Sequence, residues 1–486
     1  MRLFYFIENI VIQSITVKFI IGVHMDILKN SLTRLNNFII LFPVNMANLI
    51  QQVRDAGVIG AGGAGFPTYK KIDARVDTVI ANGAECEPLL FKDKVLMEHY
   101  AAEMIDGLRL IMQHAGANKG IVAIKHKNRK AIEAVKLHLP ANISLFEMED
   151  VYPAGDEYEV VYHSTGRRIP SGGIPLHIGV IVQNVETLYH IHRAAQGQPV
   201  THSLMTVHGH VKQPLTAWFP VGMSYGKALQ VAGGATIDDF VLLDGGPMMG
   251  KVVTDLSTSV TRVSSGIIVL GRSTHLAERK TQSEQVYKRI GKSACDQCSL
   301  CTEMCPRYLL GYPIQPHLVM RSLLTTGPMS DTLTHWAQAC CECNICSLWA
   351  CPEELDPRNV CVVTKRDLKQ QGKWLSAEQL QKLTKEVHPM KSYRGVPTTR
   401  LARRLGLHQF TAEAPLYTGQ IAPTSVGISL QPSVGVPPMP IVRVGDRVQE
   451  GEMIAAASES ALSVPAHASI AGQITAVGQS IVIARA

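Results

Sequence analysis

The chain has 486 residues, of which 46% are hydrophobic, and its formal net charge at pH 7 is +7. At roughly 150 residues per domain the length predicts about three domains or more, and the apolar content is typical of globular proteins. The charge is small for this length and the sequence holds no nucleic-acid-binding motif, so we expect no nucleic-acid partner.

Residues 1–45 differ from the rest of the chain, because Ile, Phe, Asn and Lys are common there, whereas Gly and Ala are common afterwards. The apolar run over residues 3–23 is interrupted by Glu8 and Lys18 and has no small-residue cleavage site, which argues against a spanning helix or a signal peptide. An amphipathic helix is expected from Met46 to residue 57. We therefore interpret residues 1–45 as a start-site artefact, with a membrane- or shell-targeting segment as the alternative.

A glycine-rich segment follows, with glycines at 60, 62, 63 and 65. Because glycine has no Cβ, such a loop lets backbone N–H groups approach a phosphate or a ring closely. A dinucleotide-binding fingerprint follows a strand, whereas here a helix expected over residues 48–55 precedes the glycines, which argues against an ordinary Rossmann fingerprint. A buried strand is then predicted over 78–81. It ends in the polar residues of 82–88, at the strand end where α/β sheets bind ligands.

Further elements are predicted downstream. The basic stretch 119–136 is typical of a strand, over 120–125, that runs into a helix with a solvated charged face. Residues 201–262 alternate apolar and polar side chains, which predicts a small β-rich module, with a plain spacer as the alternative. A linker helix is expected over 263–292.

Eight of the eleven cysteines form two ferredoxin-type runs, each ending in Cys-Pro. The first run consists of Cys295, Cys298, Cys301 and Cys305, and the second of Cys340, Cys343, Cys346 and Cys351. In two-cluster ferredoxins the fourth Cys of each run ligates the other run's cluster. We therefore predict one [4Fe–4S] cluster on Cys295, Cys298, Cys301 and Cys351, and another on Cys340, Cys343, Cys346 and Cys305.

Two alternatives for these cysteines are disfavoured. Disulfide frameworks belong to small secreted scaffolds, and zinc knuckles lack the third Cys and the trailing Cys-Pro. The second run departs from the pattern in two ways, by one extra residue before Cys351 and by a spare thiol at Cys341. The sequence therefore leaves open which thiols of the second run bind a cluster. Cluster thiolates place the chain in a reducing compartment.

The C-terminal part contains five prolines over residues 421–440, which predict a stiff connector. Residues 441–486 resemble a barrel-sandwich module of the biotinyl/lipoyl type. Such modules present a modified lysine, but no lysine follows Lys391, which excludes a swinging arm. We interpret the module as a docking or structural element.

Residues 60–71 and 82–88 together resemble the flavin subunit of respiratory NADH dehydrogenase, and more closely the C subunit of ion-translocating ferredoxin:NAD oxidoreductase complexes. The stretches 152–157 and 169–187 agree. The resemblance implies a multidomain α/β and α+β protein. Its domains would be a Rossmann-like FMN/NADH domain over 46–200, a β-grasp module over 201–262, a two-[4Fe–4S] ferredoxin-like domain over 293–372, a helix and Pro-rich linker over 373–440, and the barrel-sandwich module over 441–486.

The resemblance also implies residue roles. FMN would be held by the glycine loop with its lysine, by two residues after the first strand, and by a turn that grips the phosphate: Gly60, Gly62, Gly65, Lys71, Asn82, Glu85, Asn184 and Thr187. The NADH pocket would be lined by Glu87, Gly155, Asp156 and Glu157. One departure is Ala84, where the respiratory flavin protein has Asp, which removes a polar contact to the flavin.

Domain order separates the related families. In the C subunit of ion-translocating complexes the barrel-sandwich module precedes the flavin domain, whereas here it comes last. This order resembles that of the cobalamin reductases of propanediol-utilisation bacterial microcompartments. The resemblance implies electron flow from NADH through FMN and two [4Fe–4S] clusters to cobalamin, from cob(III) to cob(II)/cob(I)alamin, because a flavin accepts a hydride and releases single electrons.

It further implies an adenosyltransferase and microcompartment shell proteins as partners, a homo-oligomer, and a cytoplasmic location within or attached to a microcompartment. Two other functions stay open: an electron-input subunit of a membrane ion-translocating complex, and a non-catalytic electron-relay or scaffold protein whose flavin site has decayed. The sequence assigns no catalytic residue and does not locate a cobalamin site.

Overall fold

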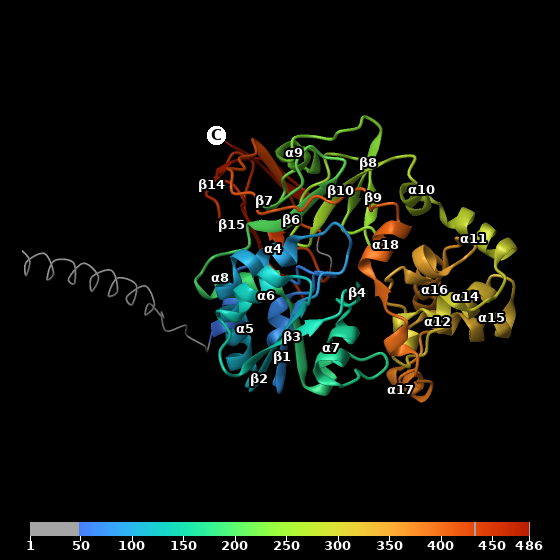
Figure 1. Cartoon of the computed structure of the whole chain (residues 1–486). Coiled ribbons are helices and arrows are strands. Elements are labelled where there is room, and N and C mark those ends of the chain that lie inside the picture. The colour runs from blue at the N-terminus through green and yellow to red at the C-terminus, as the bar shows by residue number, and fades with distance from the viewer. Residues whose placement is uncertain (1–47, 432–433, 486) are drawn as a thin grey trace, which may run out of the picture. The chain divides into compact units, whose positions relative to one another are not determined.

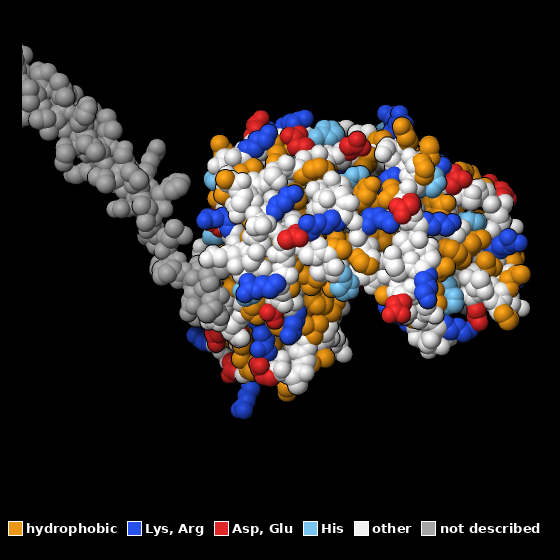
Figure 2. Space-filling model, turned by 90° about the horizontal axis from the view of Figure 1, so that it is seen from below, with side chains coloured by type: hydrophobic (Ala, Val, Ile, Leu, Met, Phe, Trp, Pro, Cys, Tyr) orange, Lys and Arg blue, Asp and Glu red, His pale blue; other side chains and the backbone are white. Residues whose placement is uncertain are grey.

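The computed structural model of the chain describes residues 48–431 and 434–485. The interpretation of residues 1–45 and the start at Met46 lie outside the described residues. Within the described ranges, no helix combines the length and apolar character needed to cross a membrane. Figure 2 shows basic and acidic side chains interspersed over the face that it presents.

Residues 48–200 form a parallel-sheet domain (Figure 1). Its strands lie in the order β3-β2-β1-β5, and all neighbouring pairs are parallel. The strands are β1 (Thr78–Gly83), β2 (Lys119–Lys125), β3 (Ile143–Met148) and β5 (Val180–Asn184). All but β3 are nearly continuous runs of buried residues, the pattern of parallel strands covered on both faces. The strands predicted at 78–81 and 120–125 are confirmed.

Helices cover both faces of this sheet. Val79 and Ala81 pack into one core with most of the helices, whereas Ile80 points into a second core with α7. The helices are α2 (Leu49–Asp55), α3 (Thr68–Ile72), α4 (Lys92–His99), α5 (Ala101–Ala115), α6 (Arg129–Lys136), α7 (Glu157–Thr165) and α8 (Val185–Ala195), with a short 3₁₀ helix η2 (Pro175–Ile178). The glycine-rich segment lies between α2 and α3, so a helix does precede it.

Residues 201–271 form a mixed-sheet module with strand order β7-β6-β10-β8-β9. Its elements are β6 (His202–Gly209), β7 (Leu215–Pro220), α9 (Tyr225–Val231), β8 (Phe240–Asp244), β9 (Lys251–Val253) and β10 (Gly266–Gly271). The hairpin of β6 and β7 is followed by α9, by the pair β8 and β9, and by the last strand, β10. Strand β10 runs parallel to β6 and lies between the two strand pairs, which is the arrangement of a β-grasp fold. The central strand β10 lies beyond the expected boundary at 262, in the segment expected to be a linker helix.

The cysteine domain, residues 293–372, is helical. The helices in and before it are α10 (His275–Thr281), α11 (Glu284–Ala294), α12 (Leu300–Glu303), α13 (Pro306–Leu309), α14 (Pro316–Ser322), α15 (Gly327–Thr334), η3 (His335–Ala337), the π-turn η4 (Cys346–Ala350) and α16 (Pro357–Gln370). The region 263–292 therefore holds a strand and two helices rather than one linker helix, because Gln282 is extended and separates α10 from α11.

After the cysteine domain the chain returns to the parallel-sheet domain. This return segment contains α17 (Ala377–Lys382), η5 (Lys391–Tyr393), β11 (Val396–Pro397) and α18 (Thr398–Arg404). Strand β11 pairs with β4 (Val151–Tyr152), and the Thr398 hydroxyl and backbone N–H both donate to Asp150. The cysteine domain is thus bounded on both sides by elements that pack elsewhere.

Residues 425–485 form the C-terminal module of two small sheets. One contains β12 (Ser425–Ser429), β18 (Ser480–Ala484), β17 (Gly472–Val477) and β14 (Arg447–Val448), and the other β13 (Met439–Pro440), β15 (Met453–Ala456) and β16 (Ala466–His467). The Pro-rich stretch is therefore more than a connector, because β12 supplies Val426 and Ile428 to a core shared with the mixed-sheet module. Figure 1 shows this module beside β6 and β7.

Candidate flavin and iron–sulfur sites

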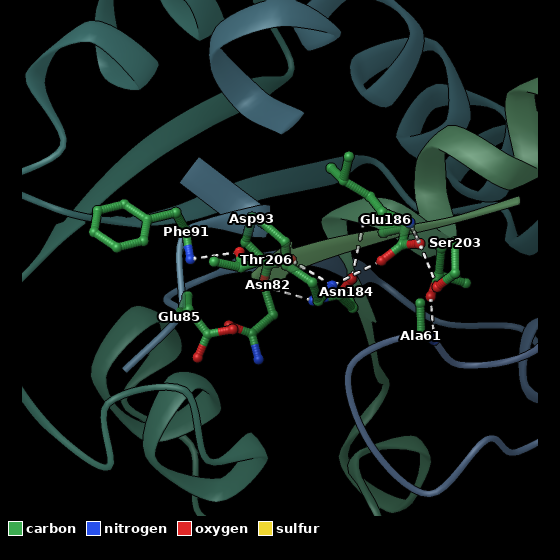
Figure 3. Close-up of polar contacts among 12 residues, drawn as sticks. Ala61, Asn82, Glu85, Phe91, Asp93, Asn184, Glu186, Ser203 and Thr206 are labelled. Atoms are coloured by element: carbon green, nitrogen blue, oxygen red, sulfur yellow. Dashed lines mark hydrogen bonds and ion pairs between the residues drawn. The ribbon is translucent and has the colours of Figure 1, made fainter. Parts of the chain in front are cut away.

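The glycine-rich loop packs against the turn that starts α8 (Figure 3). The Ala61 N–H donates to Thr187 Oγ1 at 3.0 Å, although the two residues lie 126 positions apart in the sequence. A Cβ on Gly62 would lie 2.8 Å from Asn184 Nδ2, so the close approach requires glycine there. A Cβ on Gly63 would meet nothing within 4 Å, so the loop has an open side. The structure therefore brings the loop and the Asn184–Thr187 turn together.

The remaining loop glycines shape the segment. The Gly60 N–H donates to the Phe66 carbonyl at 3.0 Å, which closes the loop at its base. Gly65 has a φ of 68°, a left-handed conformation that glycine adopts without penalty. Gly60 and Gly65 therefore maintain the conformation of the loop.

The N-terminus of α8 is oriented by a polar network. The Asn184 side chain caps the helix by accepting from the Glu186 N–H at 2.9 Å, and its Nδ2 donates to Asp93 Oδ2 at 2.9 Å. An eleven-residue helix carries a partial positive charge at this end, where phosphates bind. Figure 3 shows Asn184 between Asp93 and the Ala61 side of the site.

Behind Asn184 lies a fully buried ion cluster that the sequence analysis missed. Lys92 Nζ lies 2.8 Å from both Asp93 Oδ1 and Glu186 Oε2, and Glu186 also accepts from the Leu204 N–H. Burial alone would lower the pKa of Lys92, but the two carboxylates outweigh burial and raise that pKa. No local pattern marks these residues, because Lys, Asp and Glu are exposed in most helices.

Three further predicted positions meet at the end of β1. Asn82 Nδ2 donates to the Gly155 carbonyl at 3.0 Å, and Lys71 Nζ lies 2.9 Å from Glu157 Oε1. A Cβ on Gly155 would lie 2.6 Å from the Ala84 carbonyl, so glycine is required. The Asp156 side chain caps α7. The expected flavin and nicotinamide residues therefore form one connected site.

Two buried polar atoms at this site have no hydrogen-bond partner. They are Thr68 Oγ1, at the start of α3, and Gln183 Nε2, near the end of β5. Buried polar groups are nearly always paired, so each of these atoms is free to pair with a water or a polar ligand atom. With the open glycine loop and the cationic Lys71, these atoms fit FMN. Both lie inside the motif stretches 60–71 and 169–187, but the sequence pattern gave them no role.

The two acidic residues after β1 have different surroundings. Burial and the nearby Asp93 carboxylate raise the pKa of Glu85 to about 7. Glu87, expected in the NADH pocket, instead accepts from the Met248 and Met249 N–H groups at 2.8 and 2.7 Å. A Cβ on Gly246 would come too close to Glu87, at 2.2 Å, so that loop of the mixed-sheet module is shaped around the carboxylate.

The eight motif cysteines surround two cavities. The first is lined by Cys295, Cys298, Cys301 and Cys351, and the second by Cys340, Cys343, Cys346 and Cys305. Among the described residues, no three His, Cys, Asp or Glu side chains converge on a single-ion site. The grouping around each cavity matches the crossed ligand sets of two-cluster ferredoxins, so the thiols fit two clusters.

The two cysteine runs have the same backbone conformation at equivalent positions. Gln297 and Ser299 have φ of 58° and 65°, and Glu342 and Asn344 have φ of 63° and 70°, which is uncommon outside glycine. In this register Cys340 is the counterpart of Cys295, and Cys341 is the counterpart of Asp296. The Glu342 N–H also points at Cys340 Sγ, at 3.4 Å. Cys341 nevertheless lines the second cavity as a fifth thiol.

The second cavity lies against the parallel-sheet domain and the mixed-sheet module. Tyr152 donates to the Cys343 carbonyl at 2.7 Å, and Asn344 Nδ2 donates to the Met248 carbonyl at 2.9 Å. Arg307 donates to Asp156 Oδ2 at 2.9 Å, with its guanidinium 3.4 Å from the Tyr158 ring centroid. These contacts join the cluster loops to the same segments that form the candidate flavin site.

Three family models match the chain. They are the Nuo51 FMN-binding domain over residues 53–193, a 4Fe-4S dicluster domain over 294–356, and the RnfC barrel sandwich hybrid domain over 407–486. They confirm the expected flavin, cluster and barrel-sandwich domains and their order. The chain accordingly has an FMN-binding domain and a domain for two [4Fe–4S] clusters.

Similar curated proteins agree. The chain is 40% identical to the cobalamin reductase PduS of Salmonella typhimurium over 440 residues, which cover 90% of this chain and 96% of that protein. It is 40% identical to PduS of Citrobacter freundii over 437 residues, with the same coverage. The C subunit of the proton-translocating ferredoxin:NAD(+) oxidoreductase complex of Clostridium ljungdahlii is 32% identical over 273 residues, 55% of this chain and 57% of that one. The chain therefore belongs to the PduS family of cobalamin reductases.

Proposed function

We propose that the protein is an NADH-dependent cobalamin reductase that passes electrons through FMN and two [4Fe–4S] clusters to cobalamin. The observation that carries this proposal is 40% identity along nearly the whole length of named cobalamin reductases. Reduction of cob(III)alamin to cob(II)alamin and cob(I)alamin would support regeneration of adenosylcobalamin in propanediol degradation.

The parallel-sheet domain would bind FMN. Bound flavin supplies the conversion of a two-electron hydride donor into a one-electron source. The α8 N-terminus and the glycine loop hold the phosphate, and Asn184 and Thr187 keep these two elements together. Thr68 and Gln183 offer their unpaired polar atoms, and Lys71 provides a positive charge. Further proposed flavin contacts are Gly60, Gly62, Gly65, Asn82 and Glu85.

NADH would enter beside the loop of Gly155, Asp156 and Glu157. Glu87 was expected to line the NADH pocket, but its carboxylate already accepts hydrogen bonds from two backbone N–H groups. The Glu87 carboxylate could turn toward a bound nucleotide only if those hydrogen bonds broke. Glu87 therefore links the nicotinamide side of the site to the mixed-sheet module.

The cysteines would hold the clusters as crossed sets. Cys295, Cys298, Cys301 and Cys351 form one set, and Cys340, Cys343, Cys346 and Cys305 form the other. Each thiol must lose its proton on ligation. Four of the eight are buried, namely Cys301, Cys305, Cys343 and Cys346. The repeated backbone supports Cys340 rather than Cys341 as the ligand.

The proposed partners and location rest on the family membership. Cob(I)alamin is strongly reducing, so an adenosyltransferase that consumes it would act next to this enzyme. We place both in the cytoplasm, within or attached to a bacterial microcompartment, with shell proteins as further partners and this chain as a homo-oligomer. The family membership supports this placement.

The test uses full-length protein with FMN and both clusters reconstituted anoxically. After addition of NADH, the absorbance bands of cobalamin should change to those of the reduced forms. A Cys298→Ala variant should lose cobalamin reduction while it keeps reduction of ferricyanide, which can take electrons at the flavin. Reduction of ferricyanide without any reduction of cobalamin by the wild type would contradict the proposal.

A second candidate function is electron input to a membrane ion-translocating complex. It is favoured by 32% identity to the C subunit of such a complex, which spans only about half of each chain. That function predicts stable co-purification of the native protein with membrane partners. Isolation of the untagged protein from its own cells, with and without detergent, distinguishes the two.

A further inference from the structure

The two cysteine-lined cavities differ in exposure. Four residues that line the first cavity are exposed, namely Asp296, Cys298, Pro352 and Glu353. Every residue that lines the second cavity is buried or half-buried. All eleven cysteines lie in the described part of the chain, and among them Cys298 alone is exposed. The first cavity is therefore the one with exposed residues in its lining.

The residues that line the second cavity are covered by other segments of the chain. The contacts of Cys343 with Tyr152 and of Asn344 with Met248 cover it from the side of the candidate flavin site. On its other side, α12, which carries Cys301, packs against η4, which carries Cys346. The second cavity thus lies between the candidate flavin site and the first cavity, and the first cavity lies toward the surface.

We propose that the electron acceptor docks at the first cavity, on a rim formed by Asp296, Cys298, Leu300, Pro352 and Glu353. The proposal rests on the proposed function, because it takes cobalamin as the acceptor. The rate of electron transfer falls steeply with distance, so a large acceptor must approach the centre with the thinnest protein cover. Among the two cavities, that centre is the one beside Cys298.

The rim suits a corrin. Leu300, which is 41% exposed and follows Ser299 of the cavity wall, offers apolar contact to the macrocycle. The carboxylates of Asp296 and Glu353 accept hydrogen bonds from amide N–H groups, which the corrin carries around its edge. An acidic electron-transfer protein would instead meet like charge at these two positions.

The stoichiometry also favours an open rim. NADH yields NAD⁺, one proton and two electrons, and each electron converts one cob(III)alamin into cob(II)alamin. The two electrons therefore reduce two cob(III)alamins to cob(II)alamin, or one cob(III)alamin to cob(I)alamin. In the first case two cobalamins must use the site in turn, and a shallow rim that exchanges its occupant readily allows this.

The first test compares two exposed leucines of the cysteine domain. Leu300→Glu places a charge on the rim, whereas Leu324→Glu is a matched control at a residue that is 55% exposed and does not line either cavity. We expect Leu300→Glu to lower kcat/KM for cobalamin at least tenfold, with unchanged electron paramagnetic resonance (EPR) spectra of both clusters. Leu324→Glu should match the wild type.

The second test does not depend on activity. Both clusters are reduced with dithionite, and the relaxation of their EPR signals is measured with a water-soluble dysprosium chelate. The chelate should relax one cluster signal strongly, because only the first cavity has exposed residues in its lining. Tyr152→Phe, which alters the contact to Cys343, identifies the signal of the second cavity, and that signal should respond weakly.

The outcomes separate the two proposals. An active wild type with an equally active Leu300→Glu variant would overturn the docking site and leave the proposed function intact. Strong relaxation of the signal that Tyr152→Phe shifts would also overturn the docking site. A wild type that binds FMN and both clusters but reduces no cobalamin would overturn the proposed function itself.

Discussion

The hydroxyl of Tyr152 donates a hydrogen bond of 2.7 Å to the carbonyl oxygen of Cys343. Tyr152 belongs to the parallel-sheet domain and Cys343 to the second cluster run, so this bond crosses the boundary between flavin and cluster segments. Both residues are buried, and burial raises the pKa of the Tyr152 hydroxyl well above its usual value. The hydroxyl is therefore a permanent donor at physiological pH.

Tyr152→Phe should leave the Cys343 carbonyl without this donor. A buried unsatisfied group costs about 1–3 kcal/mol, so the melting temperature should fall. Hydrogen bonding near a cluster tunes its potential, so the potential of the second cluster should shift while that of the first stays constant. EPR-monitored redox titration measures both. Equal shifts of the two potentials would contradict the assignment of Cys343 to the second cluster alone.

Lys92→Met should destabilise the protein by about 3–5 kcal/mol, because it leaves Asp93 and Glu186 as buried charges without a partner. It should also lower FMN content, since Asp93 holds Asn184. The matched control is Lys94→Met, which removes a partly exposed pair with Glu413 and should cost about 0–1 kcal/mol. Urea unfolding and flavin absorbance provide the measurements. FMN retained at wild-type affinity would refute the positioning of Asn184 by this cluster.

Gly62→Ala should weaken FMN binding at least tenfold. The new methyl group would displace the Asn184 side chain, which lies 2.8 Å from the Cβ position, and so disturb the cap of α8. Gly478→Ala is the control, because a Cβ there meets nothing within 4 Å and the residue lies in the C-terminal module. Titration of apoprotein with FMN gives the affinities. Equal affinities of the two variants would exclude the proposed loop contact.

The backbone register of the second cysteine run makes a direct prediction. Cys341→Ser should retain both clusters, whereas Cys340→Ser should lose or alter the second, because Cys340 occupies the position of Cys295 in the repeated loop. Iron content and EPR spectra of the purified variants report the difference. If Cys341→Ser instead lost the cluster, the ligand would be the spare thiol that lines the same cavity.

Asp150 should contribute a defined part of the acid sensitivity. Burial raises its pKa, but Lys125, Thr398 and Lys127 outweigh burial and lower that pKa to about 2. Because the folded-state pKa lies below the unfolded value of about 3.9, the stabilisation is complete above about pH 4 and is lost as pH falls toward 2. Asp150→Asn should therefore be less stable at about pH 6 and show a flatter stability curve as the pH falls from there. Urea unfolding at several pH values tests this.

The cluster runs could be predicted because their signal is local. Closely spaced thiols and a trailing proline define the chemistry without any knowledge of the fold. The flavin motifs were equally local, and the structure places Asn82, Gly155 and Lys71 in one site. The parallel strands followed from their continuous apolar runs.

What could not be predicted depends on long-range contacts. Glu87 meets the Met248 and Met249 N–H groups, which lie 161 and 162 residues later, and no pattern in either segment indicates the other. From the sequence, Lys92 would be taken for an ordinary exposed helix residue, because nothing near it in the chain indicates its contact with Glu186. Strand β12 was hidden by the prolines around it, although its Ser-Val-Gly-Ile-Ser alternation has the period of a strand.

The strand pair of β4 and β11 has a consequence for how catalysis is organised in time. Since the cysteine domain is anchored before and after its helices, it is an insertion rather than a tethered carrier, and its centres stay at constant separation from the flavin segment. No large domain excursion is then needed between successive electron transfers. Only the small molecules then have to diffuse, namely the nicotinamide donor at one end and the corrin at the other.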